Sequence, residues 1–440
     1  MAARFTPSTF RALGARQFSS LAIFNYRVYF LGQLVSLIGT WMQTTAQAWL
    51  VLKLTGSPLA LGTVTTLQFL PITVFTLFGG AFADRVPKRR VLIITQSLSM
   101  LQAFTLGLLV LTGTVHLWHV YALALMLGTI NAFDGPVRQA FGVELVGREQ
   151  VVNAVALNSS IFNMARIAGP AVAGVAIATV GMSTAFLINA ASYIAVLGAY
   201  AIMRPEEFFT VPKRPPTGNV LHQIRQGISY SVRTPGILFF FILLAFFGTF
   251  GFNFTVLIPL VAEFVLKVDA KQFGFLTSAM GAGSLLAALG MAAVGRLSVR
   301  GVMVAAGAFI VVFVGIAVSH SYYLTAAMLV VLGVVSVLFS TTINTTLQIT
   351  VPDELRGRVM SIFFLLFAGS TPIGGYLTGV LAETFGVTAA LVVMASICGT
   401  GLVTALVYRQ VTGLGWSGEV KPAPLPAPVE GTPLKPASTP

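Results

Sequence analysis

Apolar residues run through this chain in long blocks that are separated by short polar segments. A helix needs about 20 mostly apolar residues to cross a bilayer, and twelve blocks are long enough. The first six lie near 28–52, 58–82, 91–113, 116–133, 151–179 and 182–203. The second six lie near 236–262, 272–294, 299–318, 321–345, 358–381 and 386–409. The pattern predicts an all-α polytopic membrane protein with twelve transmembrane helices in two six-helix bundles.

The blocks and the polar segments between them predict five regions. The linker between the bundles is rich in proline and includes a predicted amphipathic helix from Asn219 to Val232, which we expect to lie at the membrane surface. The tail is rich in Pro and Ala, a composition typical of disorder. The predicted regions are an N-terminal arm (1–27), a first bundle (28–203), a linker (204–235), a second bundle (236–409) and a disordered tail (410–440).

Composition and charge agree with this pattern. Hydrophobic residues make up 56% of the 440 residues and charged residues only 9%, whereas a soluble domain carries about 25% charged residues. The net charge of +13 does not indicate nucleic-acid binding, because the basic residues lie in short loops. Of 26 Lys and Arg, 22 fall on one side of the predicted spans and three on the other. The positive-inside rule therefore predicts that both termini are cytoplasmic.

The two predicted bundles contain related motifs. Glu144-Leu145-Val146-Gly147-Arg148 follows the fourth span, and Glu354-Leu355-Arg356-Gly357-Arg358 stands at a similar place in the second bundle. A repeat in the same orientation predicts a central site between the bundles.

Polar side chains recur inside the spans at helical spacing. The first span carries Gln33, Ser36, Thr40, Gln43, Thr44 and Gln47 on one face. Such a face either bonds to neighbouring helices or lines a watery cavity, and we favour the cavity. Further candidates for the cavity or for ion coupling are Asn131, Asp134, Asn158, Asn163 and Asn344. The many Phe residues of the seventh span, by contrast, are expected to pack or to face lipid.

Arg166 is the one charged residue well inside a predicted span. A buried Arg is costly in a membrane and marks a functional site by default. It either lines the transport path or packs helices together, and the sequence leaves both open. The 13 acidic residues all fall in loops, in the tail or at span ends. Asp84, Asp134 and Glu144 are therefore the candidates for proton coupling on the inner side, and Glu263 and Glu383 on the outer side.

The loop from Gly79 to Arg90 is the sharpest motif. Asp84 at the end of a helix can pair with an Arg of a neighbouring loop, which would make a breakable latch. The predicted latch residues are Gly80, Asp84, Arg85, Arg89 and Arg138. This loop resembles the signature of the major facilitator superfamily, although Pro87 replaces the usual glycine.

The resemblance extends beyond this loop, over residues 21 to about 410. Asn25-Tyr26-Arg27 and the segments 131–141, 153–159 and 162–170 are similar to the bacterial enterobactin-exporter-like branch of the superfamily. This resemblance implies the major facilitator fold and a place in the bacterial cytoplasmic membrane. It also implies that Gly169, Pro170 and Gly174 match the antiporter motif of the fifth span, where a proline and two glycines allow a helix to bend.

The resulting hypothesis is a secondary exporter of small amphipathic molecules such as siderophores or drugs, driven by an ion gradient, with protons expected. We expect a monomer in the lipid bilayer, with a small-molecule substrate, no nucleic-acid partner, no cofactor and no metal. No ATP-binding or zinc-protease motif occurs in the sequence, and an enzyme is not expected. The alternatives are a proton-coupled importer and a non-transporting membrane receptor or assembly protein.

Overall fold

The computed structural model describes residues 18–83, 85–210, 220–294 and 298–415. These residues form helices and no strand, and ten helical segments among them are long and apolar enough to cross a membrane. The all-α polytopic fold is therefore confirmed. The number of twelve transmembrane helices stays a prediction.

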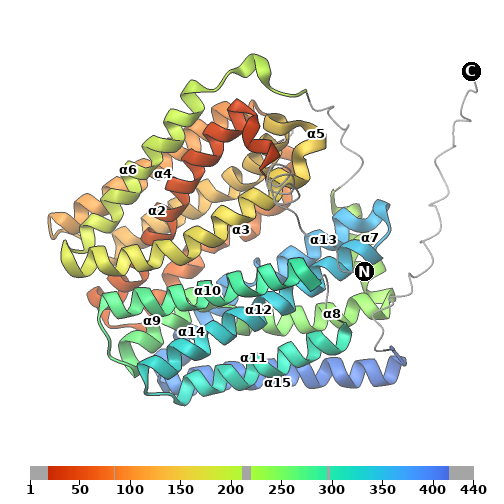
Figure 1. The fold of residues 1–440 in the computed structure, drawn as a ribbon. Coiled ribbons are helices and arrows are strands. Elements are labelled where there is room, and N and C mark those ends of the chain that lie inside the picture. The colour runs from red at the N-terminus through yellow and green to blue at the C-terminus, as the bar shows by residue number, and fades with distance from the viewer. Residues whose placement is uncertain (1–17, 84, 211–219, 295–297, 416–440) are drawn as a thin grey trace, which may run out of the picture.

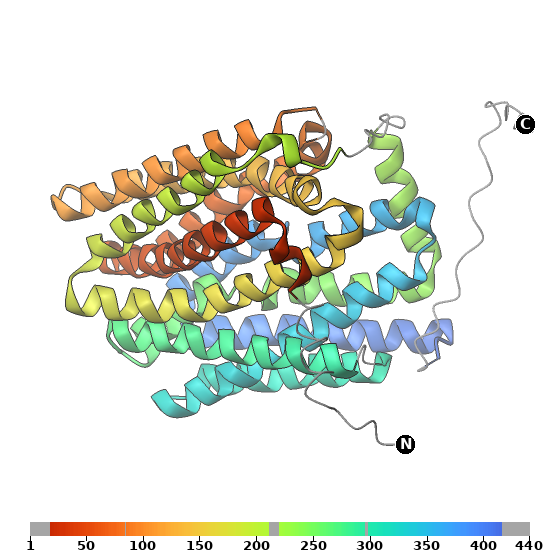
Figure 2. The same ribbon diagram turned by 45° about the horizontal axis from the view of Figure 1, so that its top comes forward.

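The first group of helices comes from the N-terminal half of the chain. It consists of α2 (Phe24–Thr55), α3 (Pro58–Ala83), α4 (Lys88–Leu111), α5 (Leu117–Thr179) and α6 (Met182–Ile202), preceded by a short 3₁₀ turn, η1 (Ser19–Ala22). Figure 1 shows this group in red to yellow-green on one side of the molecule. In both views it lies to one side of the helices of the C-terminal half, with the later part of α5 alongside α10 (Figures 1 and 2).

Helix α5 contains two of the predicted spans and turns between them. The turn is at Gly147, whose φ of 69° and ψ of 171° are not helical. A side chain is excluded there on two grounds: the φ favours glycine, and a Cβ would lie 2.9 Å from the ring of Phe209. The helix extends beyond the apolar block that the sequence placed near 116–133, since α5 continues through Pro136 to this turn.

The second group comes from the C-terminal half. It consists of α8 (Pro235–Phe246), the π-helical turn η3 (Phe247–Gly251), α9 (Phe254–Leu260), the π-helical turn η4 (Val261–Val265), α10 (Ala270–Val294), α11 (Val299–Val318), α12 (Tyr322–Thr350), α13 (Asp353–Phe367), α14 (Thr371–Phe385) and α15 (Val387–Thr412).

Two spans that the sequence predicted as continuous helices are broken. The seventh is divided into α8, η3, α9 and η4, and the eleventh into α13 and α14. The two breaks pack on each other: a Cβ on Gly374 of α14 would overlap the carbonyl oxygen of Thr249 and the amide of Asn253. Asn253 is buried and donates to the Thr249 carbonyl at 2.6 Å. Apolar periodicity could not show these breaks, because it does not report backbone hydrogen bonding.

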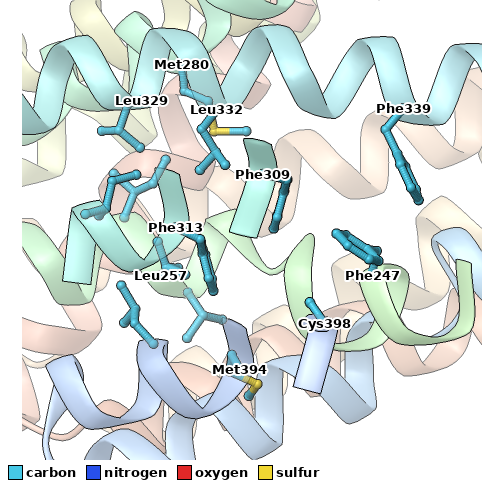
Figure 3. Close-up of a cluster of buried hydrophobic side chains, with 14 of the residues drawn as sticks. Phe247, Leu257, Met280, Phe309, Phe313, Leu329, Leu332, Phe339, Met394 and Cys398 are labelled. Carbon is cyan, nitrogen blue, oxygen red and sulfur yellow. The ribbon is translucent and has the colours of Figure 1, made fainter. Parts of the chain in front are cut away.

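The core of the second group is aromatic. Figure 3 shows Phe247 beside Phe309 and Phe339, with ring centroids 5.4 and 4.9 Å from Phe247. All three rings are at most 1% exposed, and Cys398 lies beside them, fully buried. The Phe residues of the seventh span thus pack inside the protein. Packing was one of the two expectations for them, the other being contact with lipid.

The segment between the groups includes the turn η2 (Pro205–Glu207) and α7 (Val220–Arg233). Helix α7 agrees with the predicted amphipathic helix. It packs on α13, where Arg358 donates to the Gln226 side chain and lies against Gly227. Ile228 and Val232 on the predicted apolar face are about half exposed, at 49% and 55%. This exposure fits an apolar face turned towards lipid.

Candidate functional site

A buried ion pair lies in the first group. Asp134 and Arg138 are four residues apart on α5 and therefore share one face of the helix. The Arg138 Nε donates to Asp134 Oδ2 at 2.8 Å, and its Nη2 bonds to the same oxygen. The Asp134 side chain is 3% exposed and that of Arg138 is 25% exposed. The pair is therefore far less hydrated than a surface salt bridge.

Side chains from three further helices complete the surroundings of this pair. Thr95 and Gln96 of α4 donate to Asp134 Oδ1 at 2.6 and 2.8 Å. Gln33 of α2 accepts a bond from Arg138, and its amide donates to the Tyr200 hydroxyl of α6 at 3.4 Å. Both Asp134 oxygens act as acceptors in these bonds. Helices α2, α4, α5 and α6 thus meet at a single charged group, which we call the Asp134 network.

The polar face of α2 continues as bonds between helices. Gln43 donates to Gln102 of α4 at 2.8 Å and accepts from Asn189 of α6 at 2.6 Å, while Gln47 donates to Gln68 of α3 at 3.2 Å. Gln33, Gln43 and Gln47 are between 1% and 4% exposed. In this conformation their contacts are therefore those of helix packing, and the cavity lining favoured from the sequence stays a prediction. Thr40 bonds to the Ser36 carbonyl within α2.

A cavity of about 580 Å³ lies along α5, on both sides of the turn at Gly147. It is lined by Gln139, Gly142, Val143, Val146, Val151, Ala154, Val155, Asn158, Ser159, Phe162 and Asn163. Two predicted site residues, Asn158 and Asn163, are thus brought together here. The lining is apolar with a few amides and a hydroxyl, and it carries no charged side chain.

Arg166 lies one helical turn beyond this cavity. Its guanidinium stands 5.8 Å from the ring centroid of Trp41 on α2, and the same ring meets Phe162 edge-on at 5.6 Å. Among the described residues, no carboxylate forms an ion pair with Arg166. The predicted buried charge is therefore a cation that rests on an aromatic face.

The predicted latch residues have varied surroundings. Arg89 donates to the carbonyls of Tyr200 and Ala201 at 2.9 and 3.4 Å, so it caps the C-terminal end of α6. Arg85 is exposed, and Arg138 pairs with Asp134 as described above. Gly80 belongs to α3, whereas Asp84 lies outside the described residues. The latch between Asp84 and a neighbouring Arg therefore stays a prediction.

Two further candidates make few contacts. Asn131 is half-buried in the part of α5 that precedes Gly147. Asn344 accepts a bond from Gln348 one turn later on α12, and this bond stays within one helix. Neither is joined to the Asp134 network by a described hydrogen bond.

The two groups of helices meet at the end of the molecule where α2 ends and α3 begins, here called the Lys53 end. Lys53 of α2 pairs with Glu263 of η4 at 2.8 Å, and Ser57 donates to Glu383 of α14 at 2.8 Å. The rings of Trp49 and Phe273 stack with centroids 5.1 Å apart. The sequence analysis missed Lys53 as a contact, although Lys53 is one of only three basic residues on that side and Glu263 and Glu383 are acids of the same side.

Small residues bring the groups together along α5 and α10. A Cβ on Gly174 would lie 2.8 Å from the Ala270 carbonyl of α10, whereas the contact of Gly169, whose Cβ would lie 2.5 Å from Trp41 of α2, is within the first group. Ser278 of α10 donates to the Ile167 carbonyl at 2.7 Å, close to Pro170. Helix α5 has helical dihedrals through Gly169, Pro170 and Gly174, since its non-helical residue is Gly147. The bend predicted at this motif stays a prediction, and close packing is what the structure shows.

Comparison with known proteins gives consistent matches over most of the chain. A family model described as transmembrane secretion effector matches residues 15–424. The staphyloferrin A transporter of Staphylococcus aureus is 28% identical over 373 residues, which cover 84% of this chain and 92% of that protein. The multidrug efflux pump Tap of Mycolicibacterium fortuitum is 29% identical over 364 residues, or 80% and 87% of the two chains. The crystal structure of the nucleoside transporter NupG has a TM-score of 0.66 at 14% identity, covering 89% of this chain and 98% of that one, a likeness of fold alone.

Proposed function

The chain belongs to the transmembrane secretion effector family of the major facilitator superfamily, and from that premise we propose that it exports small amphipathic molecules from the bacterial cytoplasm. Members of this superfamily are membrane transporters and not enzymes. The proposal concerns the direction, the energy source and the cargo. Export would proceed by alternating access, in which two helix groups rock about a site between them.

The observation that carries the proposal is the uneven contact between the two groups. Their contacts run along α3 from Ser57 to Thr73 and along α5 from Arg166 to Gly174. Nearer the opposite end, α5 carries the cavity, and Val152, Val155 and Phe162 are 82%, 58% and 46% exposed. If both termini are cytoplasmic, as the basic loops predict, the Lys53 end is outside and the cavity opens inward. An exporter takes up its cargo in that state and an importer releases it there, and the likeness to the multidrug efflux pump Tap favours export.

We propose that protons drive this cycle and that Asp134 carries the coupling proton. Protonation of Asp134 would remove its charge and leave Arg138 without its buried partner. The guanidinium would then seek other acceptors, and the bonds to Gln33 and to the two α4 donors would rearrange. A proton would therefore change the packing of four helices at one point, which is what coupling to a conformational change requires.

The experiment uses purified full-length protein in proteoliposomes, with an imposed pH gradient and a panel of amphipathic dyes and siderophores. Gradient-dependent movement of a cargo against the proton flow supports export, whereas movement with the protons supports the importer alternative. Asp134→Asn and Asp84→Asn should abolish gradient-driven movement while the protein stays folded. If Asp84→Asn is fully active, the predicted latch has no role in transport.

A matched control separates coupling from general damage. Glu206→Gln removes an exposed carboxylate in the segment between the groups, and this variant should transport like the unchanged protein. Transport by Asp134→Asn that still follows the pH gradient at the unchanged rate would rule out Asp134 as the coupling group. No movement of any cargo by well-folded protein would favour the non-transporting receptor or assembly protein.

A further inference from the structure

Arg166 is a membrane-embedded cation whose counter-charge is missing from its surroundings. A guanidinium inside a bilayer is normally paired with a carboxylate or with backbone carbonyls. Arg138, by contrast, is paired with the carboxylate of Asp134. Arg166 has the face of Trp41 instead, and a cation–π contact leaves the guanidinium's in-plane N–H donors available.

The position of Arg166 relates it to the cavity. Phe162 and Asn163 line the cavity, and Arg166 follows them at four and three residues, so all three lie on neighbouring positions of one helix face. Trp41 contacts both Phe162 and Arg166. The guanidinium therefore stands at one end of the cavity, separated from its lining by a single helical turn.

The backbone around Arg166 faces the second group of helices. Pro170 has no N–H to offer the Arg166 carbonyl, and Gly281 of α10 lies against that carbonyl, with a Cβ position 3.0 Å away. Arg166 thus stands where α2, α5 and α10 meet. A charge at this junction lies between the end of the cavity and the contact of the two groups.

We propose that Arg166 binds a carboxylate of the transported molecule, so that the cargo class is an amphipathic anion. This inference rests on the proposed function. The apolar part of the cargo would lie along Val143, Val155 and Phe162, and Asn158 and Asn163 would bond to its polar groups. A volume of about 580 Å³ suits a drug-sized molecule. A guanidinium binds a carboxylate through two parallel N–H bonds, which a lysine cannot reproduce. Cations are disfavoured in this site, because neither the cavity lining nor the surroundings of Arg166 among the described residues offer an unpaired carboxylate.

The experiment compares two dyes that share the xanthene ring system and differ in charge: fluorescein, an anion with a carboxylate, and rhodamine 123, a cation. Binding to the purified full-length protein in nanodiscs is measured by the fluorescence anisotropy of each dye, and transport is measured separately in proteoliposomes. We expect fluorescein to bind at least about tenfold more tightly than rhodamine 123. Arg166→Gln should remove that preference, and Arg166→Lys should retain part of it.

Arg233→Gln is the matched control, since it removes an exposed Arg outside the membrane helices and should leave the preference unchanged. A circular dichroism spectrum and a monodisperse elution profile establish that each variant is folded, and a rhodamine 123 affinity that is unchanged or higher in Arg166→Gln shows that its site persists. Equal affinity of the unchanged protein for both dyes, or an unchanged preference in Arg166→Gln, overturns the proposal. Charge-selective binding without transport of any cargo would instead support the anion site and contradict the export function.

Discussion

Replacing Asp134 by Asn removes a charge from the Asp134 network and leaves the shape of the side chain nearly unchanged. The Asn oxygen can still accept from Thr95 and Gln96, which bond to one carboxylate oxygen in the native protein. The Asn amide, however, would point its N–H groups at the guanidinium of Arg138. The substitution therefore isolates a single effect, the loss of the counter-ion of a buried cation.

The magnitude follows from the burial of the pair. Removing one partner of a buried ion pair costs about 3–5 kcal/mol, because the other charge remains without compensation. One quarter of the Arg138 side chain is exposed, so water relieves part of this penalty and we expect about 3 kcal/mol. Arg138→Gln should cost a similar amount, because it leaves the carboxylate without its cation. The double variant removes both charges. Its loss of stability should therefore be smaller than the sum of the losses of the two single variants.

The assay is reversible unfolding in mixed micelles with increasing SDS, followed by two probes. Tryptophan fluorescence, measured in a Trp416→Phe background, reports on the first group, since Trp41 and Trp49 lie on α2 and Trp118 lies on α5. Maleimide labelling of Cys398, which is fully buried, reports on the second group. A double-mutant cycle then gives the coupling energy between the two residues, which we expect to be at least about 2 kcal/mol. Additive effects of the two substitutions, within about 0.5 kcal/mol, would refute the view that this pair is a mutually dependent buried charge.

Three further predictions concern the contacts between and within the groups. Lys53→Glu should weaken closure of the Lys53 end by up to about 1 kcal/mol, and the double exchange Lys53→Glu with Glu263→Lys should restore it. The labelling rate at position 48 in an Ala48→Cys, Cys398→Ser background measures both effects. A double exchange that closes no better than Lys53→Glu alone would contradict the pairing. Gly274→Leu should raise the same labelling rate several-fold, since a side chain there meets the Pro170 carbonyl. An unchanged rate would mean that the α5–α10 contact does not hold the Lys53 end closed. Phe309→Ala should destabilise the second group by about 3–5 kcal/mol, as measured by Cys398 labelling in SDS. Val311→Ala, at a site that is 71% exposed, should change this stability little. Equal effects of the two substitutions would show that the aromatic core is not close-packed.

The pattern of apolar blocks was sufficient to predict the class of fold and most of the helices. Inside lipid a helix satisfies its own backbone hydrogen bonds, so a long apolar block predicts a membrane-spanning helix. The same argument failed where backbone geometry decides the outcome. Gly147 turns α5 through a positive φ, and Gly374 fits against Thr249 at the break of the seventh span. Neither feature changes the hydrophobicity of the chain, so neither is visible in its pattern.

The candidate site was predicted in part, residue by residue. The sequence singled out Asp134, Arg138 and Gln33 as separate candidates but did not join them, because hydrogen bonds between different helices cannot be read from spacing along one chain. Thr95 and Gln96 were missed, although they lie on one face of α4 with Ser99 and Gln102. This second stripe of polar residues was the available signal, because the polar face of α2 needs polar partners on a neighbouring helix.

The straight part of α5 beyond Gly147 has a mechanical consequence. At about 1.5 Å per residue, the helix from residue 148 to residue 179 is roughly 48 Å long, and it begins at the turn at Gly147, whose positive φ favours glycine. Tilting this helix by about 5° moves its far end by roughly 4 Å, about the length of one van der Waals contact, so a small tilt is enough to separate Gly174 from the α10 backbone that it packs against. The seal at the Lys53 end can therefore open without any helix unwinding. The displacement at the Lys53 end is set by the length of this helix, and a small tilt is enough to break the glycine contacts between α5 and α10.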